Sequence, residues 1–313
     1  MLALLQTEAR QRGLPSCVLT FEPHPRDYFA ALTKKPDLAP ARIGTLRDKL
    51  SELAACGVAQ TIVLPFDARL ASQSPEEFIQ NVLVDGLGAR YVLVGDDFRF
   101  GARRAGDYAM LDAAGDARGF DVARMNSYEV HGLRVSSSAV RVALAEGRMA
   151  DAHTLLGRPY TISGHVVHGR KLGRALGASA PGQDDGFRTL NLRFKHWKPA
   201  ASGIFAVLVH GLAERPLPGV ANLGVRPSLD ANDVNGGRVL LETHCLEWPS
   251  HLGAEGAYGK IVRVELLHKL HDELRYTSLE ALTAGIAKDG RDARAFFAST
   301  HAETHRQTTR DRI

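Results

Sequence analysis

A glycine-rich, basic loop follows an apolar, strand-like run in the middle of the chain. Three glycines and three cations lie within residues 169–177, directly after the run 160–167. Glycine lets backbone N–H groups approach a ligand closely, and guanidinium and ammonium groups pair with phosphate oxygens. The loop therefore suits a polyphosphate, and its candidate ligands are Gly169, Arg170, Lys171, Gly173, Arg174 and Gly177.

Polar groups further along the chain complete the outline of a phosphoryl-transfer site. Thr189 and Asn191 are two residues apart, so both side chains lie on one face of an extended segment. Their oxygens are hard ligands of the kind that Mg²⁺ prefers. Glu242 lies in a strand-like run and could act as a general base, and His244 shares its face of that strand. Charge neutralisation, a metal ion and a positioned hydroxyl are what phosphoryl transfer requires.

Each of these features also has an ordinary structural explanation. A single strand glutamate is most often a solvated surface residue, a Thr/Asn pair is common, and a glycine-rich loop can be a simple turn. The functional interpretation depends on their combination and order along the chain.

Six segments resemble, in the same order, the family of bacterial bifunctional riboflavin kinase/FMN adenylyltransferases (FAD synthetases). The resemblance runs from near Met1 to about Phe297. A further segment, 217–224 followed by Arg226 and Pro227, also resembles the kinase part of that family. The six segments are residues 20–25, 95–101 and 135–141 for the adenylyltransferase part, and residues 169–177, 189–191 and 241–244 for the kinase part.

For the kinase part, the resemblance implies ATP-dependent phosphorylation of riboflavin to FMN. The loop would hold the ATP phosphates, and Thr189 and Asn191 would bind Mg²⁺. Glu242 would accept the proton of the riboflavin 5′-hydroxyl. Arg275 would contact the flavin, although a surface salt bridge is the simpler explanation of that residue.

For the adenylyltransferase part, the resemblance implies transfer of AMP from ATP to FMN, giving FAD. Three serines at the start of a helix would offer hydroxyls and backbone N–H groups to phosphate. A simple helix N-cap with a surface arginine is the alternative. The implied nucleotide- and flavin-binding residues are Asp96, Asp97, Ser136, Ser137, Ser138 and Arg141.

The length of 313 residues suits two domains. In the first half, strands alternate with helices such as 45–55, which predicts an α/β fold with a doubly wound, nucleotidyltransferase-like parallel sheet. Thr45 and Asp48 form a capping-box-like start of the helix 45–55, and Ser74 and Glu77 form an N-cap and N3 pair before another helix. Ligands of such sheets bind at the carboxyl ends of the strands. The predicted strands are 17–21, 61–64 and 91–94.

The pattern changes after about residue 157. Short alternating runs at 160–167, 204–210, 239–245 and 261–267 predict a flavokinase-type antiparallel β-barrel, closed by a helix from Ser278 to about Phe297. Asn235 and Gly236 form a hairpin-type turn signal. The expected domains are 1–157 for the adenylyltransferase and 158–300 for the riboflavin kinase, followed by a frayed polar tail, 301–313.

The sequence departs from the family pattern at two places. An acidic insert, 178–185, separates the loop from Thr189, and Arg188 stands where the family has proline. We expect the insert to lower kinase activity, because small displacements of catalytic groups are costly. No HxGH motif occurs in the chain, and its start resembles the helix after that motif. We therefore expect the first strand of the sheet to be missing, the N-terminus to be truncated and FAD formation to be impaired.

Composition narrows the remaining classes of function. The formal charge of +4 fits anionic small molecules, and the chain lacks an aromatic-studded basic face for nucleic acid. No apolar run approaches the ~20 residues of a membrane span. The three cysteines are scattered along the chain, which predicts free thiols in a reducing cytoplasm. The expected partners are riboflavin, FMN and ATP, and the alternative is a degenerate, non-catalytic protein that binds flavin or nucleotide.

Overall fold

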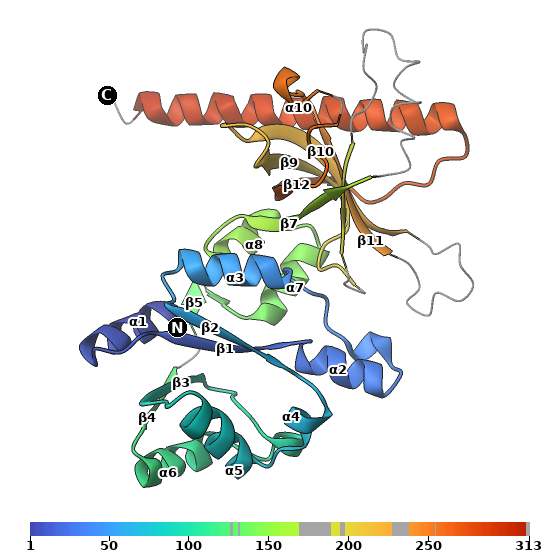
Figure 1. Cartoon of the computed structure of the whole chain (residues 1–313). Coiled ribbons are helices and arrows are strands. Elements are labelled where there is room, and N and C mark those ends of the chain that lie inside the picture. Colours follow the sequence, from blue (N-terminus) through green and yellow to red (C-terminus); the bar gives the residue numbers. More distant parts are fainter. Residues whose placement is uncertain are drawn as a thin grey trace. The chain divides into compact units, whose positions relative to one another are not determined.

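The computed structural model describes residues 1–125, 128–130, 132–168, 189–194, 198–226, 238–253 and 255–310. The chain forms two compact units. The first contains Met1–Pro40 and Lys49–Arg134, and the second contains Ala41–Asp48 and Val135–Ile313. The first unit is built on parallel strands and the second on a barrel (Figure 1).

Parallel strands form the centre of the first unit. Within its described residues, β1 (Cys17–Glu22) pairs with β2 (Gln60–Pro65), and β3 (Tyr91–Gly95) pairs with β4 (Asp121–Met125). The predicted α/β parallel class is confirmed, although hydrogen bonds join these strands in pairs and not in one continuous sheet. The surrounding elements are α1 (Leu2–Gln11), α2 (Pro25–Leu32), α4 (Ala68–Ser72), α5 (Pro75–Phe78), α6 (Tyr108–Arg118), β5 (Glu129–Val130) and β6 (Leu133–Arg134).

One apolar core holds the strand pairs of the first unit together. Ile79 and Leu111, from a π-helical segment and from α6, are almost fully buried in it, and Leu19 and Val92 from two different strand pairs pack against it. The predicted capping box before α5 is present, since Ser74 and Glu77 each accept a hydrogen bond from the other's backbone N–H.

The start of helix α3 (Leu46–Ala55) fastens the segment 41–48 to the second unit. Asp48 Oδ2 accepts a hydrogen bond from the backbone N–H of Thr45 (2.8 Å), and Thr45 Oγ1 accepts one from the N–H of Asp48 (3.1 Å). The other carboxylate oxygen of Asp48 accepts the N–H of Ser163 (3.0 Å). The predicted capping box therefore also joins two segments that are distant in sequence.

The second unit is a closed antiparallel barrel with the strand order β10-β11-β8-β7-β12-β9, which confirms the predicted barrel. The alternation pattern identified four strands and missed β8 and β10. β8 is short, and β10 contains a proline and two glycines. The strands are β7 (Tyr160–Val167), β8 (Thr189–Arg193), β9 (Gly203–His210), β10 (Leu217–Arg226), β11 (Arg238–Cys245) and β12 (Ile261–His271).

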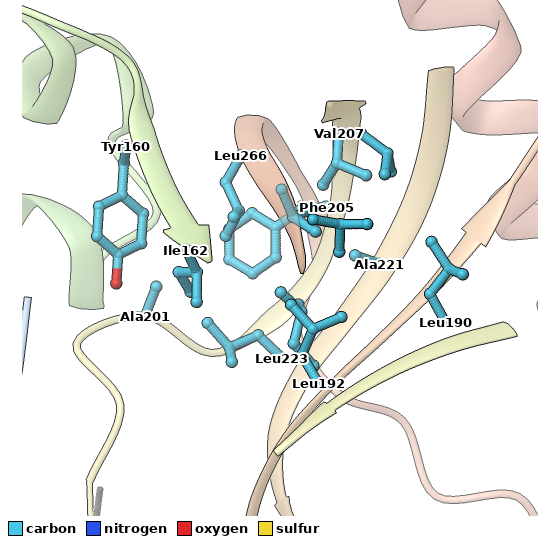
Figure 2. Packing of buried hydrophobic residues seen from close by; sticks show 14 of the residues in the cluster. Tyr160, Ile162, Leu190, Leu192, Ala201, Phe205, Val207, Ala221, Leu223 and Leu266 are labelled. Atoms are coloured by element: carbon cyan, nitrogen blue, oxygen red, sulfur yellow. The ribbon is translucent and has the colours of Figure 1, made fainter. Parts of the chain in front are cut away.

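Apolar side chains fill the inside of the barrel. Phe205, Leu192 and Leu223 are completely buried there (Figure 2). Leu241 and Val264 are buried in the same core. Alternate residues of a strand point to opposite faces, so the inward positions form a packed core. Polar residues between them lie on the outer face, where a ligand can reach them.

Helices cover parts of the barrel. α7 (Ser137–Ala145) and α8 (Met149–Leu156) contribute Val140, Leu144 and Leu155 to the barrel core. These helices therefore belong to the compact unit of the barrel, although they lie before the predicted domain limit at residue 157. The limits 1–157 and 158–300 of the two catalytic domains stay a prediction.

Helix α10 (Leu279–Arg310) packs on the outer face of the barrel. Its Ala293 is fully buried in a cluster with Ile204, Ala206 and Val220 of strands β9 and β10. The helix continues to Arg310, so the prediction that it ends near Phe297 is wrong. The polar tail 301–313 stays a prediction. No glycine or proline follows Phe297 to stop the helix.

The three cysteines are free thiols, as predicted. Cys245 lies inside the barrel, where burial raises the pKa of its thiol to about 12. Of the helices that the structure describes, none is both long and apolar enough to cross a membrane.

Candidate functional site

Strand β11 places Glu242 on the outer face of the barrel. Leu241 and Thr243, its neighbours in sequence, are fully buried, whereas Glu242 and His244 are partly exposed. The period of two along a strand explains this difference. The sequence prediction that Glu242 and His244 share one face is therefore confirmed.

The barrel register brings Glu242 next to Asn191. The two residues lie directly opposite each other on the antiparallel strands β11 and β8, and His244 lies opposite Thr189. Side chains that are directly opposite in such a pair point to the same face, with Cβ atoms about 4.5–5.5 Å apart. The predicted general base and the predicted metal ligands thus form one group on the surface of the barrel.

The side chain of Asn191 has a defined orientation. Its Nδ2 donates a hydrogen bond to the backbone carbonyl of Thr189 at 3.3 Å, and the residue is 6% exposed. A carbonyl can only accept, so this contact identifies which end of the amide is nitrogen. Among the described residues, none donates to Oδ1 of Asn191, which leaves a hard oxygen suited to Mg²⁺ beside the Thr189 hydroxyl.

The phosphate-loop candidates Gly169, Arg170, Lys171, Gly173, Arg174 and Gly177 lie outside the described residues, as do the insert 178–185, Arg188 and the Asn235–Gly236 turn. The strands that flank the loop are described. Val167, the last residue of β7, lies opposite Asn191, and β8 begins at Thr189. The two strand ends that flank the loop therefore lie beside the candidate metal ligands.

The end of strand β12 forms another border of this face. His271 lies opposite Ile204, and its Nε2 donates a hydrogen bond to Asp289 Oδ1 of α10 at 2.9 Å. The side chain of Glu273 lies against Gly224 and leaves no room there for a Cβ. Arg275 is exposed and has no ion-pair partner among the described residues, so its predicted flavin contact stays a prediction.

The protonation of His271 follows from its two neighbours. Besides the bond to Asp289, its Nδ1 lies 2.7 Å from the backbone carbonyl of Asp272. Burial is the largest influence and lowers the pKa of the imidazole. The hydrogen bonds to Asp272 and Asp289 act in the opposite direction, and the net result is a raised pKa. Both nitrogens face acceptors, so the imidazolium form is favoured.

The predicted adenylyltransferase residues belong to two different units. Asp96 and Asp97 follow β3 in the first unit and are exposed, and Asp96 pairs with Arg134 at 3.5 Å. The three serines and Arg141 lie in the second unit.

Helix α7 begins as predicted. Ser136 is its N-cap and accepts the backbone N–H of Ala139 at 3.1 Å, and Ser137 and Ser138 are exposed in the first turn. Arg141 uses its Nε to donate to the backbone carbonyl of Ala41 at 2.6 Å. That hydrogen bond holds the segment 41–48 to helix α7 and fixes the position of Nε of Arg141.

Sequence reasoning missed an aromatic cluster at the carboxyl ends of β1 and β2. The rings of Phe21, Tyr28, Phe29 and Phe66 meet edge to face, with centroids 5.3–5.9 Å apart. Phe29 is 46% exposed, so the cluster presents an apolar surface at the end of the strands where ligands of such sheets bind. The pair of adjacent aromatic residues in the middle of α2, Tyr28 and Phe29, was the available signal.

Sequence reasoning also missed Asn222 of β10, which lies directly opposite Glu242 on the side away from Asn191. The segment 217–224 was recognised as similar to the family, but no role was attached to its asparagine. Three strands that are distant in sequence thus bring Asn191, Glu242 and Asn222 into one row on the outer face.

Comparisons with known proteins identify the family of each part of the chain. Residues 1–139 match a family model described as FAD synthetase, and residues 156–297 match one described as riboflavin kinase. A solved structure titled a macrolide-efflux protein from Streptococcus pneumoniae has a TM-score of 0.67, covering 94% of this chain and 88% of that one. Its sequence identity is 24%, so this likeness shows the fold alone.

Curated relatives match over nearly the full chain. The bifunctional riboflavin kinase/FMN adenylyltransferase of Escherichia coli K12 is 44% identical over 296 residues, which is 95% of this chain and 87% of that protein. The proteins of the same name from Pseudomonas fluorescens and Haemophilus influenzae are 41% and 38% identical, and each match covers 88% of the relative and 95% or 94% of this chain. The chain belongs to the family of bifunctional riboflavin kinase/FMN adenylyltransferases.

Proposed function

We propose that the barrel unit transfers the terminal phosphoryl group of ATP to the 5′-hydroxyl of riboflavin. The observation that carries this proposal is the register that places Glu242 directly opposite Asn191 on the outer face. A base for the hydroxyl and an oxygen ligand for the metal are both needed within a few ångströms of the reacting phosphate. The pairing of these two side chains on one face supports the proposal.

In the proposed reaction, the 5′-oxygen of riboflavin forms a bond to the γ-phosphorus and the bond from that phosphorus to the bridging oxygen of ADP breaks. Glu242 takes the hydroxyl proton. Thr189 and Asn191 hold Mg²⁺, which when bound neutralises charge on the phosphates. Arg170, Lys171 and Arg174, with the glycines of the loop, hold the ATP phosphates, and Arg275 contacts the flavin.

We further propose that the second activity of the family, the adenylylation of FMN to FAD by ATP, uses the other set of residues. Asp96 and Asp97 at the end of β3 contact nucleotide or flavin, while Ser136, Ser137, Ser138 and Arg141 contact phosphate. The exposed hydroxyls at the start of α7 support this role, because a helix N-terminus attracts anions. The aromatic cluster around Phe29 offers an apolar surface for the flavin ring.

Several smaller proposals accompany these reactions. The sequence boundary between the catalytic domains lies near residue 157. The insert 178–185 lowers kinase activity. The protein works in the cytoplasm on small molecules. Free cysteines support a reducing compartment.

A turnover assay tests the kinase proposal. The full chain is incubated with riboflavin, ATP and Mg²⁺, and FMN is measured by chromatography. Glu242→Gln keeps the size of the side chain and removes the base, so we expect turnover to fall about 10²–10⁴-fold. Glu247→Gln is the matched control, because Glu247 is an exposed glutamate just after the same strand. Full turnover in Glu242→Gln would show that this residue is not the base, and an inactive wild type would favour the non-catalytic alternative.

A further inference from the structure

Asn222 is a polar residue on the outer face of β10. Its neighbours in sequence, Ala221 and Leu223, are buried in the barrel core. Across the strands, Asn222 lies between Glu242 of β11 and Ile204 of β9. It therefore has the proposed base on one side and the apolar surface beneath helix α10 on the other.

The side-chain oxygen of Asn222 is buried and has no hydrogen-bond partner among the described residues. A buried amide oxygen without a donor reduces stability, because the group has lost its bonds to water. Native proteins satisfy nearly all such groups, and an exception in a functional region indicates a partner that is supplied from outside.

Thr243 provides a useful comparison. Its Oγ1 is also buried without a partner, but Thr243 is 0% exposed and its neighbours on the same face of β11 are the core residues Leu241 and Cys245. A ligand has no access to that position. Asn222 is partly exposed and lies on the face that carries Glu242 and Asn191, so a ligand at that group can reach it.

The chemistry of the missing partner follows from the position. The oxygen of an amide accepts hydrogen bonds or binds a hard cation. The proposed metal ligands lie on the other side of Glu242, so the partner of Asn222 is a hydrogen-bond donor. Glu242 is an acceptor when it acts as a base, and Ile204 has no polar side chain. A substrate whose reacting hydroxyl lies at Glu242 must supply the donor from a neighbouring group. A polyol chain does so, since each of its carbons carries another hydroxyl.

We propose that Asn222 accepts a hydrogen bond from a ribityl hydroxyl of riboflavin next to the 5′-hydroxyl, and so positions the reacting end of the chain at Glu242. This inference rests on the kinase function proposed above. Asn222 then selects for a flavin with a hydroxylated side chain. A substitution of Asn222 should therefore leave ATP binding unchanged.

Asn222→Leu tests this role, because leucine has a similar size and cannot accept a hydrogen bond. We expect the dissociation constant of riboflavin, measured by flavin fluorescence, to rise about tenfold, the value of one good hydrogen bond. The KM for ATP should not change. The melting temperature should not fall, since the substitution removes an unsatisfied buried group. Thr243→Val is the matched control and should leave both ligands unaffected.

Riboflavin analogues that lack the 2′-, 3′- or 4′-hydroxyl separate this role from a structural one. For one of the three analogues, wild type should bind about tenfold more weakly than it binds riboflavin. The Asn222→Leu variant should bind that analogue no more weakly than it binds riboflavin. If every analogue loses the same factor in both proteins, or if Asn222→Leu binds riboflavin normally, the inference is wrong. If wild type forms no FMN from riboflavin, the kinase proposal itself fails, which is a separate outcome.

Discussion

Asn191 on β8 and Glu242 on β11 lie directly opposite each other on the outer face of the barrel, although 51 positions separate them in sequence. The pairing places a neutral amide beside the carboxylate, with the amide nitrogen directed to the carbonyl of Thr189. The proposed metal ligand and the proposed base therefore occupy neighbouring strands. The effect of a substitution at one of them should be distinguishable from the effect of a substitution at the other.

Asn191→Ala should raise the Mg²⁺ concentration that is needed for half-maximal kinase activity by about 10–100-fold, the range typical of damaged metal sites. The removed oxygen is one of few protein ligands that such a magnesium site has. Titration of activity with Mg²⁺ at saturating riboflavin and ATP measures the effect. Asn191→Asp retains an oxygen ligand and should need much less metal than the alanine variant. An unchanged Mg²⁺ requirement in Asn191→Ala would remove this residue from the metal site.

The pair of His271 and Asp289 should stabilise the barrel more at low pH than at high pH. The folded pKa of His271 is raised, so the stabilisation is complete below the unfolded value near 6.5 and is lost as pH rises through the folded value. Asp289→Asn should lower the melting temperature by about 2–4 °C at pH 6, and less at pH 8.5. Asp292→Asn, a partly exposed carboxylate of the same helix that pairs with Lys288, is the control. If the difference in melting temperature between wild type and Asp289→Asn were the same at both pH values, the charge of His271 would not contribute to stability.

The three serines at the start of α7 should differ in their effect on stability, because Ser136 alone caps the helix. Ser136→Ala removes the N-cap bond to Ala139 and should cost about 0.5–2 kcal/mol of stability. Replacing Ser137 and Ser138 by alanine should leave stability nearly unchanged and reduce FAD formation from FMN and ATP. Urea unfolding and chromatographic assay of FAD measure the two effects. If the double variant forms FAD at the wild-type rate, these hydroxyls do not contact the phosphates.

Phe205→Ala should destabilise the barrel by about 3–5 kcal/mol. Phe205 is completely buried among Leu223, Leu266 and Ile162 in the barrel interior (Figure 2), so the substitution leaves a cavity that its neighbours cannot fill. Phe205→Leu should cost much less. Chemical unfolding followed by circular dichroism measures both, and a loss below about 1 kcal/mol for the alanine variant would contradict this description of the core.

Local patterns in the sequence predicted most of the elements. Apolar alternation identified β7, β9, β11 and β12, and capping boxes identified the starts of α3 and α5. The same patterns missed β8 and β10, because a short strand and a strand with proline and glycines carry weak local signals. They also placed the end of α10 too early, since polar residues without a helix-stopping signal do not define a helix end.

The sequence by itself determined which face each side chain of a strand takes, and so that Glu242 and His244 point away from Leu241 and Thr243. That information is local, because it depends only on the period of two along an extended chain. The tertiary structure decided that Asn191, Glu242 and Asn222 share one row, and that Asn222 has a buried oxygen without a partner among the described residues. Strand register depends on how the whole barrel closes around its core, and no single segment contains it.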